Sequence, residues 1–491
     1  MPILNRSNAL TAKGTVSVPG EHRTATVWGA SPVRTGMRHD APMSSTADTQ
    51  GHAQPARGPL LPEFQLTAFP RWALVRQDMD AGEIGDVRAA VRAALEPVMP
   101  LVVPGMRVCL TGGSRGIDRI AEVLRTAVER LREAGAVPFI VPAMGSHGGA
   151  TADGQLAVLA GFGITPDSMG CEIRSSMDTV DLGEVAPGIP VYVDRNAYEG
   201  ADLIVPVNRV KPHTGFTGPV ESGLMKMIAI GMGKQKGADT FHRQGYARFA
   251  ELIPAVARHT IAHAPIAFGL ALVENGMVRL AHVEAVPASR IEEREAELLA
   301  MARAGMARLP LPALDVLIVD EMGKDISGVG MDPNVIGRAH DGRRAAGPAI
   351  QRIVIRGLTR ATEGNAAGIG FADVALRRAV AAVDPRKTYM NTVTAKAPEE
   401  ARIPLTVDTD REALALALAT CVGVDAPGVG VDAPGVRMLR VRSTKHLDLL
   451  YASEAALGDV LATGRCEIVE PLREIAFDED GMFVDDALAG S

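Results

Sequence analysis

The sequence has few cysteines and few aromatic residues. Its 491 residues include four cysteines, Cys109, Cys171, Cys421 and Cys466, which are far apart and form no CxxC pair. Zinc ribbons and iron–sulfur centres use closely spaced cysteines, so the sequence predicts neither. No secretory signal is recognisable at the N-terminus, and together with the sparse cysteines this predicts a cytoplasmic location.

Long apolar runs and a strong charge of one sign are also missing. No apolar stretch reaches the roughly 18 residues that a membrane span needs, so we expect no membrane association. The net charge of −7 arises partly from six acidic residues and no basic ones in the segment 474–491. This balance gives no basic surface for nucleic acid. An apolar content of 47% with 51 Gly and 32 Pro is typical of α/β proteins.

The two ends of the chain differ from its body. Residues 1–59 are rich in Pro, Ser, Thr and Ala without sustained periodicity, which predicts a disordered extension. The alternative is an over-long reading frame that truly starts at Met37 or Met43. The heptapeptide GVDAPGV occurs twice in tandem, at 423–429 and 430–436, and predicts an exposed loop. An acidic tail is expected over 471–491.

Alternating strand and helix patterns fill the body. A short apolar run at 106–111 precedes GGSRG and a helical pattern over 117–134, and a second run at 137–143 precedes GSHGGA and a helix from about residue 152. This order predicts a Rossmann-like parallel β-α-β unit with glycine-rich loops at the carboxyl ends of its strands. Further strands are expected at 202–207, 267–273, 315–320, 353–356 and 437–442, with helices at 291–304 and 371–383.

These patterns predict an α/β fold of two domains with an active-site cleft between them. The N-terminal catalytic domain is expected over 60–284 and the C-terminal α/β domain over 285–470. Because open α/β sheets bind ligands beyond the carboxyl ends of their strands, the glycine-rich loops are candidate sites. Arg115 in the first loop can clamp a carboxylate or phosphate, and His147 in the second is flanked by small residues that leave its ring accessible.

Chemically reactive residues are densest between Asn208 and His242. This stretch contains two histidines and four lysines directly after an expected strand, together with frequent glycines and large apolar residues. Those apolar residues predict packing rather than a solvated loop. Half-buried Lys and His side chains need partners, so an anionic ligand or a metal is expected here.

The residues named so far form an ordered set that resembles a known family, the nickel-pincer nucleotide-dependent lactate racemases and related 2-hydroxy acid racemases and epimerases. The resemblance runs from about Gly105 to Glu454. It rests on Arg115, on GSH at 145–147, on PH at 212–213 with GF and TG following, and on Lys226 and His242, which are sixteen residues apart. Compared with the family, three extra residues including Glu221 separate His213 from Lys226.

The resemblance implies an isomerase that inverts a small 2-hydroxy acid by hydride transfer to a nickel-bearing pincer mononucleotide derived from pyridinium-3,5-dicarboxylate. It implies that Lys226 tethers the cofactor covalently and that His242 is the protein ligand to nickel. His147 and His213 would be the acid/base pair, and Arg115 would hold the substrate carboxylate. Gly112, Gly145 and Lys236 are further candidates for cofactor contact, and cofactor-synthesis enzymes are implied as partners.

Two points stay open at the level of sequence. The second contact to the substrate carboxylate is either Lys324 or Arg338, both in the segment after Asp320. The alternatives to a racemase are a nicotinamide-dependent oxidoreductase and a non-catalytic homologue that binds a nucleotide or metal. The cofactor loop of short-chain dehydrogenases has a third glycine where this chain has Asp118, and no Tyr is followed four residues later by Lys.

Overall fold

The computed structural model describes residues 69–79, 82–339, 347–423, 435–484 and 487–488. All of them belong to one compact unit, residues 58–491. The extension expected over 1–59 lies outside the described residues, as does nearly all of the repeated heptapeptide. Among the described residues no helix combines the length and the apolar character that crossing a membrane requires.

The first parallel unit forms as the apolar runs predict. β2 (Arg107–Gly112) leads through a glycine-rich loop to α2 (Ile120–Glu133), and β3 (Val137–Pro142) pairs with β2 in parallel. In β2, Cys109 belongs to one apolar core while Val108 and Leu110 belong to another, because neighbouring side chains of a strand point to opposite faces. Both faces of this sheet are therefore buried, as parallel sheets require.

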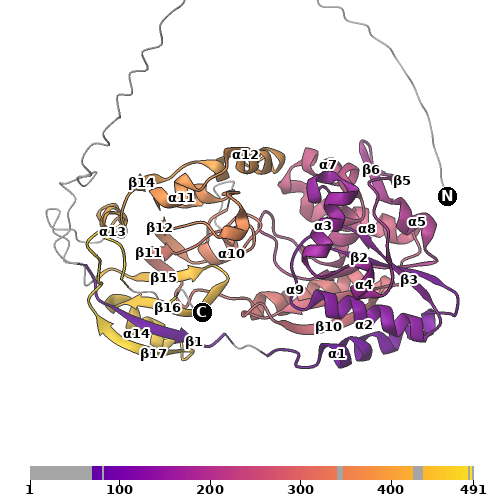
Figure 1. Cartoon of the computed structure of the whole chain (residues 1–491), viewed down its shortest axis with the longest axis horizontal. Coiled ribbons are helices and arrows are strands. Elements are labelled where there is room, and N and C mark those ends of the chain that lie inside the picture. The colour runs from indigo at the N-terminus through magenta and orange to yellow at the C-terminus, as the bar shows by residue number, and fades with distance from the viewer. Residues whose placement is uncertain (1–68, 80–81, 340–346, 424–434, 485–486, 489–491) are drawn as a thin grey trace, which may run out of the picture. The chain divides into compact units, whose positions relative to one another are not determined.

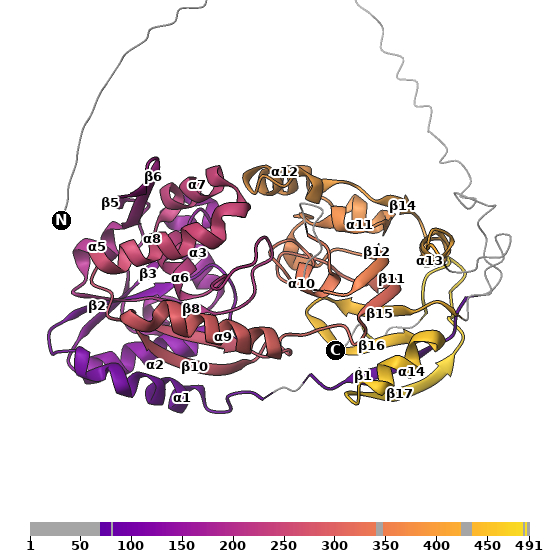
Figure 2. The same ribbon diagram turned by 180° about the vertical axis from the view of Figure 1, so that it is seen from behind.

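The remaining elements from α1 to α9, here called the first half, extend this unit; the elements from β11 onward, together with β1, are called the second half. Its parallel sheet has the strand order β4-β3-β2-β7. A separate three-stranded sheet has the order β10-β9-β8, and a single residue, Pro206, separates β7 from β8. Helices α1 and α2 pack on one face of the parallel sheet, and helices α5 and α8 pack on the other (Figure 1, Figure 2). The other strands are β4 (Glu172–Ile173), β5 (Thr179–Ala186), β6 (Ile189–Asp194), β7 (Leu203–Val205), β8 (Val207–Arg209), β9 (Phe268–Glu274) and β10 (Leu280–Pro287). The other helices are α1 (Val87–Leu95), α3 (Ala152–Gly161), α4 (Pro166–Met169), α5 (Arg195–Gly200), α6 (Leu224–Lys226), α7 (Lys234–Gln244), α8 (Phe249–His263) and α9 (Ile291–Gly305).

The second half is built on an eight-stranded sheet with the order β14-β13-β12-β11-β15-β16-β1-β17. Strands β14 to β15 of this order are parallel, and β16, β1 and β17 are antiparallel to their neighbours. Its strands are β1 (Trp72–Gln77), β11 (Ala313–Val319), β12 (Ala349–Ile355), β13 (Val374–Leu376), β14 (Leu405–Val407), β15 (Met438–Ser443), β16 (His446–Ser453) and β17 (Cys466–Arg473). Its helices are α10 (Pro333–Ile336), α11 (Arg377–Ala381), α12 (Pro385–Thr394), α13 (Asp410–Ala419) and α14 (Glu454–Ala462).

The α/β class and the parallel units are confirmed, and three details differ from expectation. β1 lies between β16 and β17, so a strand from before residue 80 belongs to the sheet of the second half (Figure 1). The stretch 371–383, expected as one helix, divides into β13 and the short α11 because its apolar Val-Ala-Leu run pairs with β12. β17 continues to Arg473, past the expected start of the tail. The domain limits 60–284 and 285–470 stay predictions.

Candidate active site

Loops at one edge of the first sheet carry most of the predicted residues. β3, β2 and β7 are parallel, so the loops after them lie at a common edge, and the strand order reverses direction between β3 and β7 around β2. Arg115 follows β2, His147 follows β3, and His213 follows β8. Such reversal points are where open α/β sheets bind ligands. The second sheet has the same kind of reversal at β11, and Lys324 follows that strand.

Short-range contacts fix the loop of His147. Its Nδ1 is hydrogen bonded to the hydroxyl of Ser114, from the neighbouring loop. Gln155 of α3 donates from Nε2 to the carbonyls of Gly145, at 2.9 Å, and His147, at 3.3 Å. Gly148 has a φ of +66°, and a side-chain carbon there would lie 2.6 Å from the backbone of Gly154. Glycine is therefore required directly after His147.

The candidate glycines act through packing. A side-chain carbon at Gly112 would lie 2.8 Å from Leu159 of α3, so this position lets α3 approach β2. Gly145 has a φ of +58°, and its N–H donates to the carbonyl of Gly231 at 3.1 Å. These contacts bring the His147 loop against the segment after Lys226.

Cations surround His147. Burial first, and then the positive charges of Arg115, Lys226 and Lys324, lower the pKa of His147 to about 3. Burial and then Arg115 lower the pKa of Lys226 to about 7 and that of Lys324 to about 8. A side-chain carbon at Gly328 would lie 3.1 Å from Nη2 of Arg115, so the loop after β11 reaches this cluster directly.

The cluster of Arg115, His147, Lys226 and Lys324, here called the cation cluster, remains accessible to solvent. Arg115 and His147 are exposed, and Lys226 and Lys324 are half-buried. The mutual repulsion of Arg115, Lys226 and Lys324 favours binding of an anion.

Lys226 and His242 are neighbours in space as well as in the motif. Lys226 is the last residue of α6 and is followed by a π-helical turn, Met227–Gly231, a feature that is frequent at functional sites. His242 lies in the last turn of α7. Burial lowers the pKa of His242, and the charge of Lys226 lowers it next. A neutral imidazole therefore faces a lysine with a depressed pKa.

His213 is held by its backbone and its ring. Its N–H donates to the buried carboxylate of Glu221 at 2.7 Å, and its Nδ1 accepts from the N–H of Gly215 at 2.9 Å. The ring lies 4.5 Å from that of Phe216 and 6.1 Å from that of Tyr246. Tyr246 also lies 6.1 Å from the ring of His242. This tyrosine therefore connects the two histidines.

The structure separates the two candidates for the second carboxylate contact. Lys324 lies in the cation cluster, and its Nζ donates to the amide oxygen of Asn391. Arg338 pairs instead with Asp373 at 2.7 Å and donates to three backbone carbonyls, including that of Phe371. Its guanidinium holds the edge of the second half's core and is not among the groups that act on His147.

Lys236 also lies apart from the cation cluster. Its side chain is exposed, and its Nζ stands 5.7 Å from the centre of the Tyr192 ring. The neighbouring Lys234 is fully buried and pairs with Asp194 at 2.7 Å. The four lysines of the dense stretch therefore divide between Lys211 and Lys226 near Arg115 and two that serve other contacts.

Comparison with known proteins adds a likeness of fold. No protein-family model matches the chain. No curated protein matches it in sequence. A solved structure, the lactate racemase apoprotein from Thermoanaerobacterium thermosaccharolyticum, is similar with 18% identity and a TM-score of 0.40, over 73% of this chain and 82% of that chain. These values are too low to assign the chain a family or an activity.

Metal binding by this protein's side chains alone is not indicated. Within the described ranges, no group of three or more His, Cys, Asp or Glu side chains is placed to hold a metal ion. A metal near His242 would need most of its ligands from another molecule.

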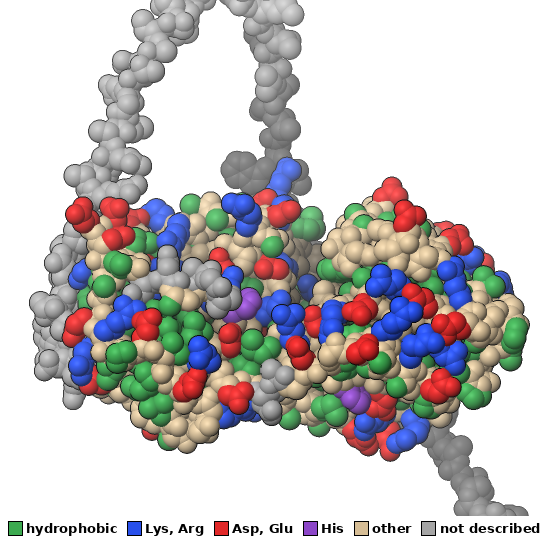
Figure 3. Space-filling view, turned by 60° about the horizontal axis from the view of Figure 1, so that its bottom comes forward, with side chains coloured by type: hydrophobic (Ala, Val, Ile, Leu, Met, Phe, Trp, Pro, Cys, Tyr) green, Lys and Arg blue, Asp and Glu red, His purple; other side chains and the backbone are tan. Residues whose placement is uncertain are grey.

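On the face shown in Figure 3, acidic and basic side chains are interspersed and form no extended patch of one sign.

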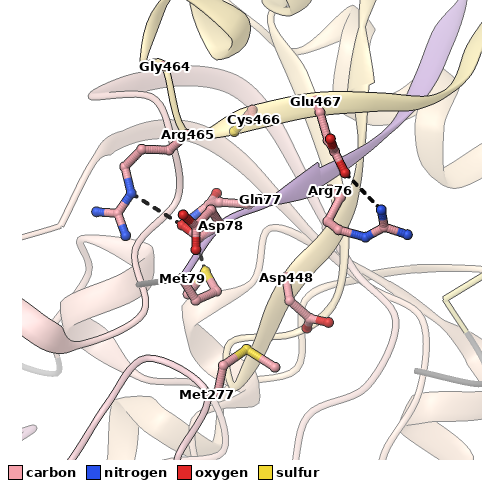
Figure 4. Close-up of a pocket in the computed structure, with 10 residues that line it drawn as sticks. All are labelled: Arg76, Gln77, Asp78, Met79, Met277, Asp448, Gly464, Arg465, Cys466 and Glu467. Atoms are coloured by element: carbon pink, nitrogen blue, oxygen red, sulfur yellow. Dashed lines mark hydrogen bonds and ion pairs between the residues drawn. The ribbon is translucent and has the colours of Figure 1, made fainter. Parts of the chain in front are cut away.

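Two cavities lie away from the cation cluster. One, of about 570 Å³, is lined by residues of β1, β16 and β17, with Arg76 paired to Glu467 and Arg465 bonded to the carbonyl of Asp78 (Figure 4). The other, of about 550 Å³, includes Arg338. In the first cavity, Arg76 and Glu467 neutralise each other.

Sequence reasoning missed several residues of the site. Ser114 was within the quoted GGSRG motif and could have been assigned as the partner of a histidine. Tyr246 follows His242 by four residues, a helical spacing that brings side chains together. Glu400 carried no such signal, because it reaches Lys324 only through the fold of the second half; burial raises its pKa to about 7.

Proposed function

We propose that this protein is a racemase or epimerase of a small 2-hydroxy acid. The observation that carries the proposal is the cation cluster, in which the charges of Arg115, Lys226 and Lys324 act on the solvent-accessible His147. A 2-hydroxy acid presents a carboxylate for the cations and a hydroxyl for the imidazole. Arg115 and Lys324 would hold the carboxylate, the former in the bidentate manner of a guanidinium.

The residues around Lys226 suit a covalently tethered nickel-pincer nucleotide. With a pKa of about 7, Lys226 is an uncharged amine in about half of the molecules at neutral pH and can form a bond to a carboxylate-derived group. His242, whose pKa is lowered, offers the neutral imidazole that a metal ion requires. Once bound, such a group would supply the hydride acceptor that inversion at carbon needs.

The protein's own residues would move the proton. His147 would take the hydroxyl proton of the substrate and return it. The surrounding cations weaken it as a base, and the bound carboxylate of the substrate would offset their charge and raise its pKa. His213 is the second histidine of the proposed acid/base pair. The loops after β2, β3 and β11 would exclude part of the solvent from the reacting atoms.

A nicotinamide-dependent oxidoreductase is less well supported. Asp118, at the position of the third glycine of a dinucleotide loop, is engaged in fixing that loop to β10. Its carboxylate accepts from the N–H of Leu280 at 3.0 Å and lies 3.4 Å from Arg279, while its own N–H donates to Glu274 at 2.7 Å. We keep the cytoplasm as the proposed location, since all four cysteines are unpaired thiols.

Covalent loading gives the decisive test. The full chain would be co-expressed with pincer-synthesis enzymes, then examined by intact mass, metal content and chiral chromatography of a panel of 2-hydroxy acids. We expect an added mass that maps to Lys226, bound nickel and racemisation of at least one acid. Lys226→Met should abolish all three, whereas the exposed control Lys236→Met should keep them. An adduct on Lys236, or no adduct and no nickel, would refute the proposal.

A further inference from the structure

A buried acid of α9 holds the start of the helix that carries Lys226. Glu295 is 1% exposed, and its Oε2 accepts from the backbone N–H of Met225 at 2.8 Å. The N–H of Leu224 stabilises the same carboxylate. These are the first N–H groups of α6, which have no partner within the helix. Glu295 therefore caps α6 from another helix, a task that usually falls to the residue before a helix.

Gly223, the residue before α6, makes room for this carboxyl. A side-chain carbon at Gly223 would lie 2.5 Å from Oε1 of Glu295, so a larger residue would displace the acid. The carbonyl of Gly223 accepts from Nδ2 of Asn208 at 2.8 Å and from the N–H of Met227 at 3.0 Å. The start of α6 is thus tied both to α9 and to β8, three residues before Lys226.

Stability alone does not explain an acid at this place. Oε1 of Glu295 is buried and has no hydrogen-bond partner among the described residues. Burial raises the pKa of Glu295 to about 7, and the N–H groups of α6 oppose this rise. A buried carboxyl with an unused oxygen costs free energy, so its presence calls for a reason other than stability. The N–H groups that it binds belong to the helix of Lys226.

The same helix α9 holds the other end of the segment between His213 and Lys226. Arg303 pairs with the buried Glu221 at 2.5 Å, and Glu221 accepts from the backbone N–H of His213 at 2.7 Å. Glu295 and Arg303 are eight residues apart, about 12 Å along the helix axis. Because both contacts come from one helix, they fix the spacing between the two ends of this segment.

We propose that Glu295 is a positioning residue for Lys226: by capping α6 from α9, it holds the amine in place at a fixed spacing from the His213 loop. Glu295 acts only through the first turn of α6. The use of this position for tethering a cofactor rests on the proposed function. The position itself does not, so it can be measured on protein without cofactor.

The reactivity of Lys226 reports its position. Full-length protein expressed without pincer-synthesis enzymes would be methylated reductively for a short time at neutral pH. Peptide mass analysis would give the ratio of methylation at Lys226 to that at the exposed Lys236. In the parent this ratio should exceed one, because Lys226 has a pKa of about 7 and is partly uncharged.

Two substitutions of Glu295 separate the cap from the bulk of the side chain. Glu295→Leu leaves the buried N–H groups of α6 without an acceptor, so the first turn should loosen and Lys226 should become hydrated and protonated. We expect the ratio to fall by about 10-fold or more, because even a modest rise in the pKa of Lys226 leaves little uncharged amine at neutral pH. Glu295→Gln keeps an acceptor oxygen and should stay within about twofold of the parent.

Asp86→Ala is the matched control. It removes a cap of the same kind, the bond from the N–H of Ala89 at 2.9 Å, from α1, which carries no candidate site residue. This variant should lower Tm and leave the methylation ratio unchanged. If Glu295→Leu does not fold, Gly223→Ala takes its place, because the added carbon displaces the carboxyl, and the same fall in the ratio is expected.

An unchanged ratio in Glu295→Leu, or in Gly223→Ala where it stands in, would overturn the proposal even if Tm falls, because Glu295 would then only stabilise the fold. A Glu295→Gln variant as impaired as Glu295→Leu would overturn it equally. After co-expression with pincer-synthesis enzymes, we expect about 10–100-fold less adduct on Lys226 in Glu295→Leu than in the parent, as misplaced reacting groups lose rate. If the parent itself acquires no adduct, the proposed function fails, and the methylation ratio alone supports or overturns the positioning role.

Discussion

The buried pair of Lys234 and Asp194 allows a quantitative test of how the site is supported. Both side chains are completely inaccessible and stand 2.7 Å apart. Lys234 also donates to the carbonyl of Pro142 at 2.5 Å and to the amide oxygen of Gln155 at 3.2 Å. Gln155 in turn holds the loop of His147. Lys234 therefore connects the end of β3 to the base of the site.

Lys234→Met would leave the carboxylate of Asp194 buried without its partner. Removing one member of a buried ion pair costs about 3–5 kcal/mol in the free energy of unfolding. For a domain of about 150–250 residues, that corresponds to a fall in Tm of roughly 6–20 °C. The double variant Lys234→Met/Asp194→Asn should recover most of this loss, because asparagine removes the charge and can still cap α5, whose Ala197 N–H bonds to Asp194 at 3.0 Å.

The loss of stability in Lys234→Met should become larger as pH rises. Burial raises the pKa of Asp194, and Lys234 opposes that rise. Without Lys234 the pKa rises further, so the folded single variant binds a proton more tightly than the unfolded chain does. Its stability relative to the parent therefore decreases as pH rises above the ordinary Asp value. Urea midpoints followed by circular dichroism at pH 5 and pH 7 test this; a single variant as stable as the double one at pH 7 would refute the reasoning.

Three further predictions concern the cation cluster. Reductive methylation followed by peptide mass analysis should modify Lys226 with a midpoint near pH 7, whereas the surface control Lys387, whose pKa is raised by a neighbouring carboxylate, reacts only at higher pH; equal midpoints would contradict the assignment. Oxalate binding should take up a proton at pH 5 but not at pH 8, because an anion raises the pKa of His147 from about 3 towards its ordinary value; calorimetry in buffers of different ionisation enthalpy measures this uptake, which His147→Gln should remove. Lys324→Met should weaken oxalate binding by about 10–100-fold with little change in Tm, whereas Arg338→Met should lower Tm and leave binding unchanged; the reverse pattern would exchange their roles.

Local patterns predicted those parts of the fold that depend on local sequence. The run before GGSRG and the 3.6-residue period after it gave β2 and α2 to within a few residues, since strand, loop and helix each carry their own signal. β17 escaped prediction because its side chains are mostly half-buried or exposed and it contains Pro471. Its partner β1 is recognisable as a strand of this sheet only from the pairing itself.

The candidate site was predictable to the extent that its residues follow strands. Arg115, His147 and Lys324 all follow parallel strands, and the structure brings them together. Arg338 could not be excluded from sequence, because its partner Asp373 is 35 residues away in the chain. Spacing likewise could not show that Lys236 is exposed, since that depends on how α7 packs against the first half.

The position of β1 has a consequence for the order of assembly. Arg71, directly before this strand, pairs with Glu454, which is 383 residues later. At typical synthesis rates of 5–20 residues per second, the ribosome completes β16 and β17, the neighbours of β1, about 20–80 s after β1 itself. The first half, whose strands pair among themselves, can fold in that interval, and the eight-stranded sheet closes around β1 last. A single cut between the halves would therefore release a second half that lacks an interior strand.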